Sequence, residues 1–270
     1  MARRFLGFCN GLLNTVGFII LLVLGSYAGF ALWDNQQIYM SAENVQADML
    51  MYKAEKSDDE DSVAKMFQDL REINPDVRAW LTLDQTKIDY PLLYGATNQS
   101  YLNRNVYEEF SISGSIFIDS RCNPELRSCY TLVHGHHMTN RQMFGDLDLY
   151  KDQKFFEENR TGTIILPDRT YSLLTAACLI VDSMDQVIFE PEKWADDIEK
   201  PLRYAQSIAL HYDNEQIERL LQENEEAKNG GKPPQIVALA TCSTEYDTAR
   251  TVLLAEMIEV QPDEEKEEEI

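Results

Sequence analysis

Two groups of residues in this sequence of 270 have the types and positions that nucleophilic catalysis requires. Cys242 follows the apolar run 238–241, which reads as a strand, and Arg250 begins the next expected strand. A thiol attacks as its thiolate, and because the pKa of a free cysteine is about 8.5, it needs a basic or cationic neighbour. A fixed guanidinium could stabilise a developing oxyanion. If the two strands form a hairpin, Cys242 and Arg250 face each other at its open end.

Three of the four histidines supply a candidate base, because His134, His136 and His137 stand together at the end of another expected strand. Alternation along a strand points His134 and His136 to one face, and Gly135 between them permits close backbone approach. The cluster could instead bind a metal. Zinc usually takes four ligands from Cys, His, Asp or Glu, and no second cysteine or Cys-x-x-Cys pair accompanies these histidines, so we expect no metal site.

The other cysteines suggest less chemistry. Cys9 lies in the apolar N-terminal stretch, and Cys178 lies in an apolar run that is typical of a buried core. Cys122 and Cys129 flank a short polar loop and could form a disulfide outside the cell, although spacing alone does not fix the geometry. Cys242 is left over, and a leftover thiol in an exported protein indicates a reactive role.

The two strongest candidates also have purely structural explanations. A thiol in an apolar run, as at Cys242, is more often a core residue than a nucleophile. Arg250 could simply pair with Asp247 or Glu245 at the surface, where ion pairs contribute little to stability. The combination of thiol, base and cation is therefore the signal, rather than any one residue.

The elements that must position these residues follow from the sequence periodicity. Short runs rich in Val, Ile, Tyr and Thr predict eight strands, near residues 79–83, 88–94, 115–118, 130–135, 162–166, 171–181, 235–241 and 251–260. Helical insertions are expected at 141–159 and 191–226, the second ended by Asn229-Gly230-Gly231. Many short strands favour a closed barrel over a doubly wound sheet. We therefore predict a mainly β fold, a closed eight-stranded β-barrel with helical insertions.

The N-terminus predicts a membrane anchor. Arg3 and Arg4 precede the uncharged stretch 5–33, and about 20 apolar residues span a bilayer as a helix. The positive flank favours an N-terminus inside the cell and a domain outside it, so we expect a single-pass cell-membrane protein. A cleaved signal peptide is the alternative, although the long apolar run favours an anchor that is retained.

The chain accordingly divides into four expected segments. These are the membrane anchor (1–40), a helical stalk and N-terminal helix (41–72), the barrel with the candidate catalytic residues (73–260) and an acidic disordered tail (261–270). The net charge of -22 argues against nucleic acid as a partner, because phosphate binding needs clustered Lys and Arg. Acidic runs such as 58–61 are usually hydrated.

Several motifs, in order along the chain, resemble those of one enzyme family. Thr241-Cys242 at a strand end, with Arg250 opening the next strand, is similar to the sortase signature. Class B sortases have a histidine motif similar to residues 135–138 followed by 143–147, and further motifs similar to residues 73–77, 80–81, 88–91 and 114–119. The long helical insertion before the strand of Cys242 also resembles that class. The resemblance covers approximately residues 65–260.

This resemblance implies a role for each matching residue. Cys242 would be the nucleophile, His136 the general acid and base, and Arg250 the oxyanion stabiliser. Asn98 and Leu102 resemble substrate-groove positions of the family, with ordinary loop polarity and packing as the alternative, and Thr241 is a third expected substrate-binding position. The sequence departs from the family at Ala240, where a serine is usual, and the missing hydroxyl would affect rate or specificity.

The implied activity is cysteine transpeptidation at a Gram-positive cell surface. The thiol would cleave a Thr–Gly bond in the C-terminal sorting signal of a surface protein. The acyl group would then pass to an amine of a lipid-linked peptidoglycan precursor or of a pilin lysine. No cofactor is expected, and the acidic runs lack the EF-hand pattern of a calcium site.

Two other functions fit parts of the sequence. An extracytoplasmic cysteine peptidase of the papain type is disfavoured because His136 precedes Cys242 by 106 positions, whereas papain-like enzymes have the cysteine first. Caspase-like peptidases have the histidine first, but their Gln-Ala-Cys signature is absent. A membrane-anchored binding module without catalysis, in which Cys242 is merely buried, is the second alternative.

Overall fold

The structure, a computed structural model, describes residues 2–54, 60–195, 197–242 and 248–260, and for Glu60 and Cys242 it describes the backbone alone. The chain forms two compact units, Met1–Ser41 and Ala42–Ile270. The first unit belongs to helix α1 (Ala2–Leu50), which is long and apolar enough to cross a membrane by length and composition. The expected apolar segment is therefore a helix that could span a membrane.

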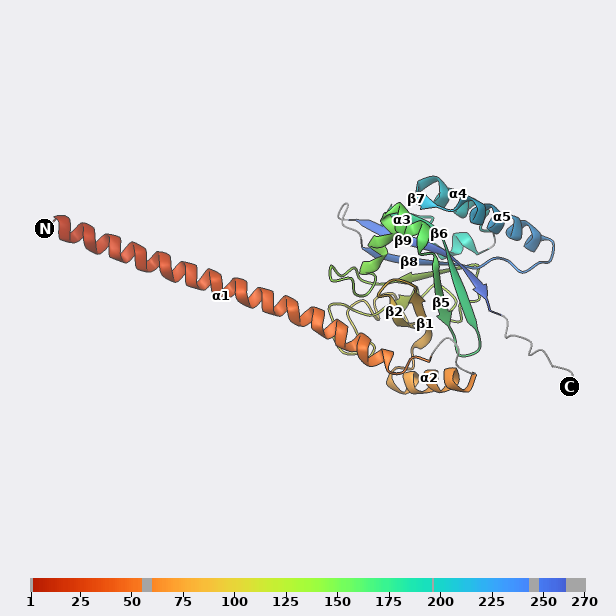
Figure 1. The fold of residues 1–270 in the computed structure, drawn as a ribbon, viewed down its shortest axis with the longest axis horizontal. Coiled ribbons are helices and arrows are strands. Elements are labelled where there is room, and N and C mark those ends of the chain that lie inside the picture. The colour runs from red at the N-terminus through yellow and green to blue at the C-terminus, as the bar shows by residue number, and fades with distance from the viewer. Residues whose placement is uncertain (1, 55–59, 196, 243–247, 261–270) are drawn as a thin grey trace. The chain divides into compact units, whose positions relative to one another are not determined.

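Eight strands of the second unit close into a barrel (Figure 1). Their spatial order is β5-β1-β2-β3-β4-β8-β9-β6, and β6 pairs back with β5. The strands are β1 (Val77–Leu83), β2 (Asp89–Leu93), β3 (Phe117–Ile118), β4 (Tyr130–His134), β5 (Thr161–Ile165), β6 (Thr170–Asp182), β8 (Ile236–Cys242) and β9 (Ala249–Glu259). Each lies at one of the eight predicted positions. The prediction of a closed eight-stranded barrel is confirmed.

A ninth strand, β7 (Ala209–Tyr212), pairs with β6 outside the closed ring and contradicts the expected helix 191–226. The insertion instead contains η2 (Pro191–Trp194), α4 (Glu199–Ile208), β7 and α5 (Asn214–Lys228). Periodicity could not separate the four-residue strand from its flanking helices, because so short a run matches either pattern. The insertion expected at 141–159 is likewise two short helices, η1 (Gly145–Lys151) and α3 (Gln153–Glu158).

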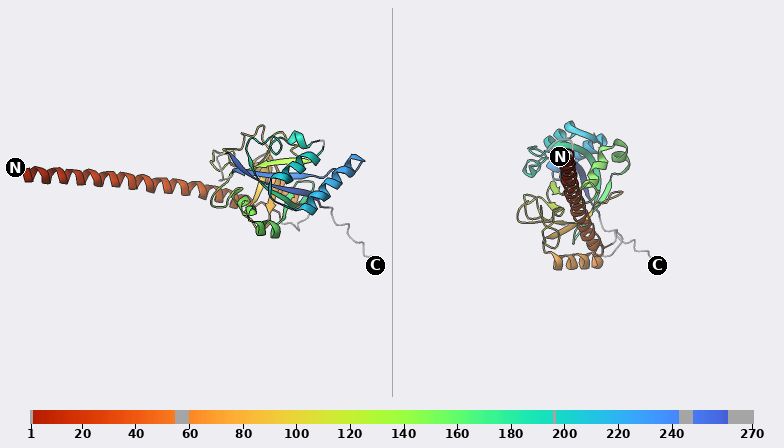
Figure 2. Two further views of the ribbon diagram at one scale, coloured as in Figure 1. Left: turned by 90° about the horizontal axis from the view of Figure 1, so that it is seen from above. Right: turned by 90° about the vertical axis from the view of Figure 1, so that its left-hand side faces the viewer.

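The strands that position the candidate site are buried deeply. Ile236 to Ala240 of β8 and Val252 to Ala255 of β9 are at most 3% exposed. Such continuous apolar runs are typical of strands that are covered on both faces. Figure 2 shows β8 and β9, both in blue, side by side. A buried pair of adjacent strands therefore carries Cys242 and Arg250.

A further cluster of buried side chains joins the helices at the start of the second unit to the barrel. Met49 of α1 and Phe67 and Leu70 of α2 (Glu60–Ile73) pack with Trp80 of β1, and each is at most 1% exposed. Burying a large apolar side chain contributes about 1.5–3 kcal/mol, so this contact fixes α2 on the barrel.

Candidate active site

Cys242 and Arg250 are direct partners in the ladder between β8 and β9. Thr241 and Thr251 form the preceding pair, so the expected hairpin is formed, and the backbones of the two candidate residues pair at the end that adjoins the connection between the strands, not at its open end. The connecting residues Glu245 and Asp247 lie outside the described residues, as does the side chain of Cys242. Arg250 is partly buried, and its Nη1 donates a 2.8 Å hydrogen bond to the carbonyl of Ala249.

The third strand of the site is β4, which lies on the other side of β8 and runs parallel to it. Every residue of β4 pairs with the residue 106 positions later, from Tyr130 with Ile236 to His134 with Ala240. The amide of Gly135 continues the contact by donating to the carbonyl of Ala240 at 3.1 Å. The ladder ends at this point, and His136 follows it at the same offset of 106 positions from Cys242.

The ring of His136 is held by a backbone carbonyl. Its Nε2 lies 2.8 Å from the carbonyl oxygen of Leu102. A carbonyl oxygen can only accept a hydrogen bond, so Nε2 carries a hydrogen and Nδ1 is the nitrogen left to take or give a proton. Leu102 therefore contributes its backbone to the geometry of His136, in addition to any contact that its partly exposed side chain makes.

One cleft of about 330 Å³ brings the predicted site residues together. It is lined by the five of them whose side chains are described, which are Asn98, Leu102, His136, Thr241 and Arg250. Thr241 is 2% exposed, and its hydroxyl has no hydrogen-bond partner in the described part of the chain. Ala240, His134 and Phe189 also line the cleft. Residues from four separate stretches of sequence thus meet at one hollow.

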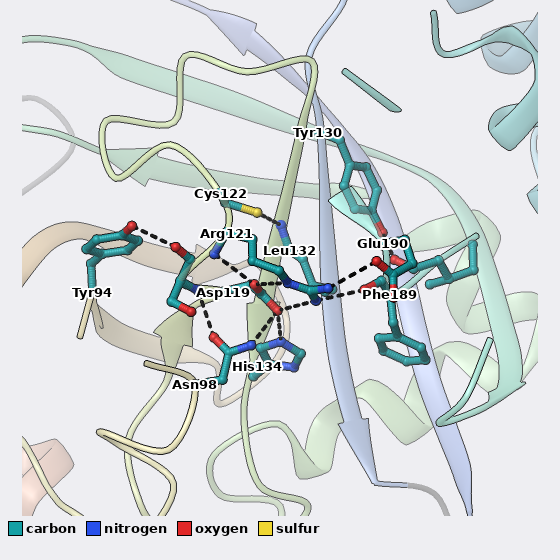
Figure 3. A network of polar contacts seen from close by, with 12 residues as sticks. Tyr94, Asn98, Asp119, Arg121, Cys122, Tyr130, Leu132, His134, Phe189 and Glu190 are labelled. Carbon is teal, nitrogen blue, oxygen red and sulfur yellow. Dashed lines mark hydrogen bonds and ion pairs between the residues drawn. The ribbon is translucent and has the colours of Figure 1, made fainter. Parts of the chain in front are cut away.

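A network of polar contacts that sequence reasoning missed lies against this cleft, and Figure 3 shows its members around Asp119. The carboxylate of Asp119 accepts hydrogen bonds from Asn98 Nδ2 at 2.8 Å and from Nε and Nη2 of Arg121 at 2.9 Å. His134 Nε2 lies 3.0 Å from the same carboxylate. Asn98 also accepts from the amide of Ser120 at 2.7 Å.

The carboxylate of Asp119 is fully buried. Burial by itself raises the pKa of a carboxyl group, but the hydrogen bonds from His134 and Arg121 outweigh it and hold the pKa of Asp119 well below its usual range. Asp119 is therefore ionised throughout the neutral range. A single aspartate at the end of an apolar strand was the signal available in the sequence, since a carboxylate there must be paired to be buried.

Comparisons with known proteins decide the family. No family model matches the chain. It is 29% identical over 203 residues to sortase B of Staphylococcus aureus, covering 74% of this chain and 78% of that protein. It is 30% identical over 194 residues to sortase B of Listeria monocytogenes, covering 71% of this chain and 73% of that protein. The chain belongs to the sortase B family.

The fold of this sortase agrees with solved members of the family. A crystal structure of a Streptococcus pyogenes class B sortase, involved in pilus biogenesis, matches it with a TM-score of 0.62 and 30% identity. The match covers 71% of this chain and 97% of that one. The chain is a cysteine transpeptidase of the sortase type, as the sequence motifs indicated, and not a papain-like peptidase or a binding module without catalysis.

The third clustered histidine of the sortase, His137, has a partner of its own. Its Nε2 lies 2.7 Å from a carboxylate oxygen of Asp148, and its backbone bridges to Met143. His134, His136 and His137 are thus held by three different groups, a buried carboxylate, a carbonyl and a partly exposed carboxylate. Within the described ranges, no cluster of three or more His, Cys, Asp or Glu residues could hold a metal ion.

The disulfide that the sequence left open is not formed. Cys122 carries a free thiol and is not bonded to Cys129, and its sulfur accepts a 3.3 Å hydrogen bond from the amide of Leu132. Cys178 is buried in β6, as its apolar surroundings in the sequence predicted.

Proposed function

We propose that this sortase uses Cys242 as its nucleophile, His136 as its general acid and base, and Arg250 as the stabiliser of the oxyanion. The observation that carries the proposal is the register of three adjacent strands. The ladder of β8 and β9 pairs Cys242 with Arg250, and His136 follows β4 at the offset of 106 positions from Cys242 that relates β4 to β8, which supports the proposal. These are the three functions that acyl transfer through a thioester requires.

The first half of the proposed reaction forms an acyl-enzyme. The thiolate of Cys242 attacks the carbonyl carbon of the Thr–Gly bond, and the guanidinium of Arg250 stabilises the negative oxygen of the tetrahedral intermediate. The C–N bond then breaks, and Nδ1 of His136 gives its proton to the leaving amine. The product is a thioester between the threonine and Cys242.

The second half transfers the acyl group. An acceptor amine attacks the thioester carbon, the C–S bond breaks, and Cys242 leaves as its thiolate. The proton of the attacking amine passes to Nδ1 of His136, which restores the starting state. Throughout both halves Nε2 of His136 keeps its hydrogen bond to Leu102, so one nitrogen orients the ring while the other moves the proton.

The proposed substrates are surface proteins with a C-terminal sorting signal, bound along the cleft. Asn98 uses its amide oxygen and one N–H within the protein, which leaves its second N–H for a substrate carbonyl. The side chain of Leu102 is 42% exposed and would contact an apolar group of the signal. Thr241 lies beside them in the lining of the cleft. The acceptor would be a peptidoglycan precursor or a pilin lysine, the latter favoured by the pilus role of the Streptococcus pyogenes relative.

The proposed location of this chemistry is the outer face of the cell membrane. Helix α1 is long and apolar enough to act as the anchor, and Arg3 and Arg4 favour an N-terminus that stays inside. Protease treatment of intact cells tests this topology, and a catalytic unit that remains protected would contradict it.

Turnover of a peptide that carries a sorting motif, by the full chain in detergent, tests the nucleophile. Cys242→Ala is expected to abolish both peptide cleavage and transfer to an amine while the thermal unfolding midpoint stays unchanged. Activity retained by this variant would place the nucleophile elsewhere.

A further inference from the structure

Asp119 is a buried carboxylate that the proposed reaction does not use. It directly follows β3, is 0% exposed, and is one of the residues that border the cleft. Its carboxylate interacts with three side chains, those of Asn98, Arg121 and His134. The carboxylate oxygen Oδ1 also accepts a 3.0 Å hydrogen bond from the backbone amide of Arg121. Figure 3 shows these partners around Asp119, and all three also line the cleft.

The first wall carries the acid and base. His134 is the last residue of β4 and lies two positions before His136. Its backbone pairs with Phe117 on one side and with Ala240 on the other, and its ring packs against that of Phe117 with centroids 5.3 Å apart. The contact with Asp119 adds a side-chain interaction at the end of the strand from which His136 emerges.

The second wall is the segment after β6. Ser183 and Phe189 of this segment line the same cleft as His134 and His136. Arg121, while bound to Asp119, donates from Nη2 to the carbonyl of Phe189 at 2.8 Å and from Nη1 to the carboxylate of Glu190 at 3.3 Å. One guanidinium thus ties a segment almost seventy residues away in the sequence to the carboxylate that also holds His134.

Asn98 joins the same carboxylate to the loop that supports His136. Asn98 and Leu102 belong to the connection between β2 and β3, and the carbonyl of Leu102 holds the ring of His136. Because Asn98 donates to Asp119 and accepts from the amide of Ser120, a shift of this loop at Asn98 would break its contacts to both residues.

We propose that Asp119 is a positioning residue for transpeptidation, one that couples the wall carrying His136 to the wall formed by residues 183–190. The proposal rests on the function proposed above, because it takes His136 as the acid and base. Its two contacts have separate consequences. The contact with His134 sets the position of the proton-transferring ring, and the contact through Arg121 sets the wall against which the sorting signal lies.

Two single substitutions separate these consequences. His134→Phe keeps a ring against Phe117 but removes the donor to Asp119, and is expected to lower kcat by roughly tenfold with KM within about twofold of the native value. Arg121→Gln releases Phe189 and Glu190, and is expected to raise KM for the sorting peptide by roughly tenfold with kcat within about twofold. Asp119→Asn should change both kcat and KM. Arg121→Lys, which keeps a charged donor, should have a KM between that of Arg121→Gln and the native value.

Glu256→Gln is the matched control. Glu256 is a buried carboxylate, 4% exposed, bound by Arg219 and Gln216, and it pairs with Ile236 at the opposite end of β8 from Cys242. Its substitution is expected to lower the thermal unfolding midpoint without changing kcat or KM.

Hydrogen exchange of the amides supplies a second readout that does not depend on the reaction. In Asp119→Asn, the amides of residues 133–138 and those of residues 183–190 should both exchange faster than in the native chain. In Arg121→Gln, only the amides of residues 183–190 should exchange faster. In Glu256→Gln, neither range should change. If His134→Phe and Arg121→Gln behave like Glu256→Gln, or change kcat and KM alike, the coupling proposal is wrong. Exchange that follows the expected pattern in a chain with no peptide turnover would instead contradict the proposed function and leave the coupling intact.

Discussion

The carbonyl oxygen of Leu102 lies 2.8 Å from Nε2 of His136, and Gly114 packs against that same carbonyl. Gly114 has a φ of +57°, and a Cβ added to it would stand 2.5 Å from the oxygen of Leu102 and 2.7 Å from that of Tyr101. A side chain at position 114 must therefore displace the group that orients the proposed acid and base.

Gly114→Ala is expected to lower turnover by up to about 100-fold, the effect of misplacing a catalytic group by about 1 Å. It should also destabilise the fold by about 1–3 kcal/mol, because a non-glycine residue at positive φ is strained. Gly230→Ala is the control, since Gly230 also has a positive φ, +102°, but nothing lies within 4 Å of its added Cβ. Steady-state kinetics and thermal unfolding of both variants make the comparison. Equal turnover in the two would show that the Leu102 contact does not govern His136.

Thiol reactivity should single out Cys242. Burial raises the pKa of Cys122 to about 12, which the hydrogen bond from Leu132 only partly offsets, so this thiol stays protonated at neutral pH. Cys178 is fully buried, whereas Cys129 is partly exposed and serves as the internal reference. With Cys9 replaced by serine, iodoacetamide at pH 7 is expected to label Cys242 at least about tenfold faster than Cys129, because cations beside a thiol favour its thiolate. Peptide mass mapping measures both rates, and equal rates would remove the case for an activated nucleophile.

Substitution of the two neighbouring histidines should separate the acid and base from a structural partner. His136→Ala is expected to lower kcat by about 10²–10⁴, the usual contribution of general acid–base catalysis. His137→Ala removes the contact with Asp148 but no proton-transferring group, so it should lower the thermal unfolding midpoint and leave kcat within roughly tenfold of the native value. A larger kinetic effect at His137 than at His136 would reverse the assignment.

Acid should reveal how much Asp119 stabilises the fold. Its pKa in the folded chain lies below the unfolded value of about 3.9, so its stabilisation is complete above that pH and is lost as the pH falls toward the folded pKa. The difference in thermal unfolding midpoint between the native chain and Asp119→Asn is therefore expected to be constant from pH 7 to about pH 5 and to shrink below about pH 4. A difference that stays constant down to pH 2.5 would mean that His134 and Arg121 do not stabilise the ionised form.

The barrel could be predicted because each of its eight strands is a local apolar run, and the register of the β8 and β9 hairpin followed from the short connection between Cys242 and Arg250. The sequence could not show that β4 is the parallel neighbour of β8. The pairing of β4 with β8, 106 positions away, depends on the closure of the whole barrel. The same holds for Arg121, whose partners Phe189 and Glu190 lie in a distant segment. Asn98 was expected to face substrate, and its role in holding Asp119 became visible only with the loop in place.

Arg250→Lys is the sharpest test of the oxyanion role. The substitution keeps the positive charge but loses the planar fork of donors that can hold a carbonyl oxygen. If Arg250 only formed a surface ion pair, the lysine variant would be nearly neutral, since such pairs contribute about 0–1 kcal/mol. Because Arg250 is partly buried, lines the cleft and pairs with Cys242, we expect a loss of about 2.7–4 kcal/mol of transition-state stabilisation, or about 10²–10³ in kcat. Turnover of a sorting-motif peptide by the two proteins measures this loss, and a lysine variant with nearly native kcat would leave Arg250 as a structural residue of β9.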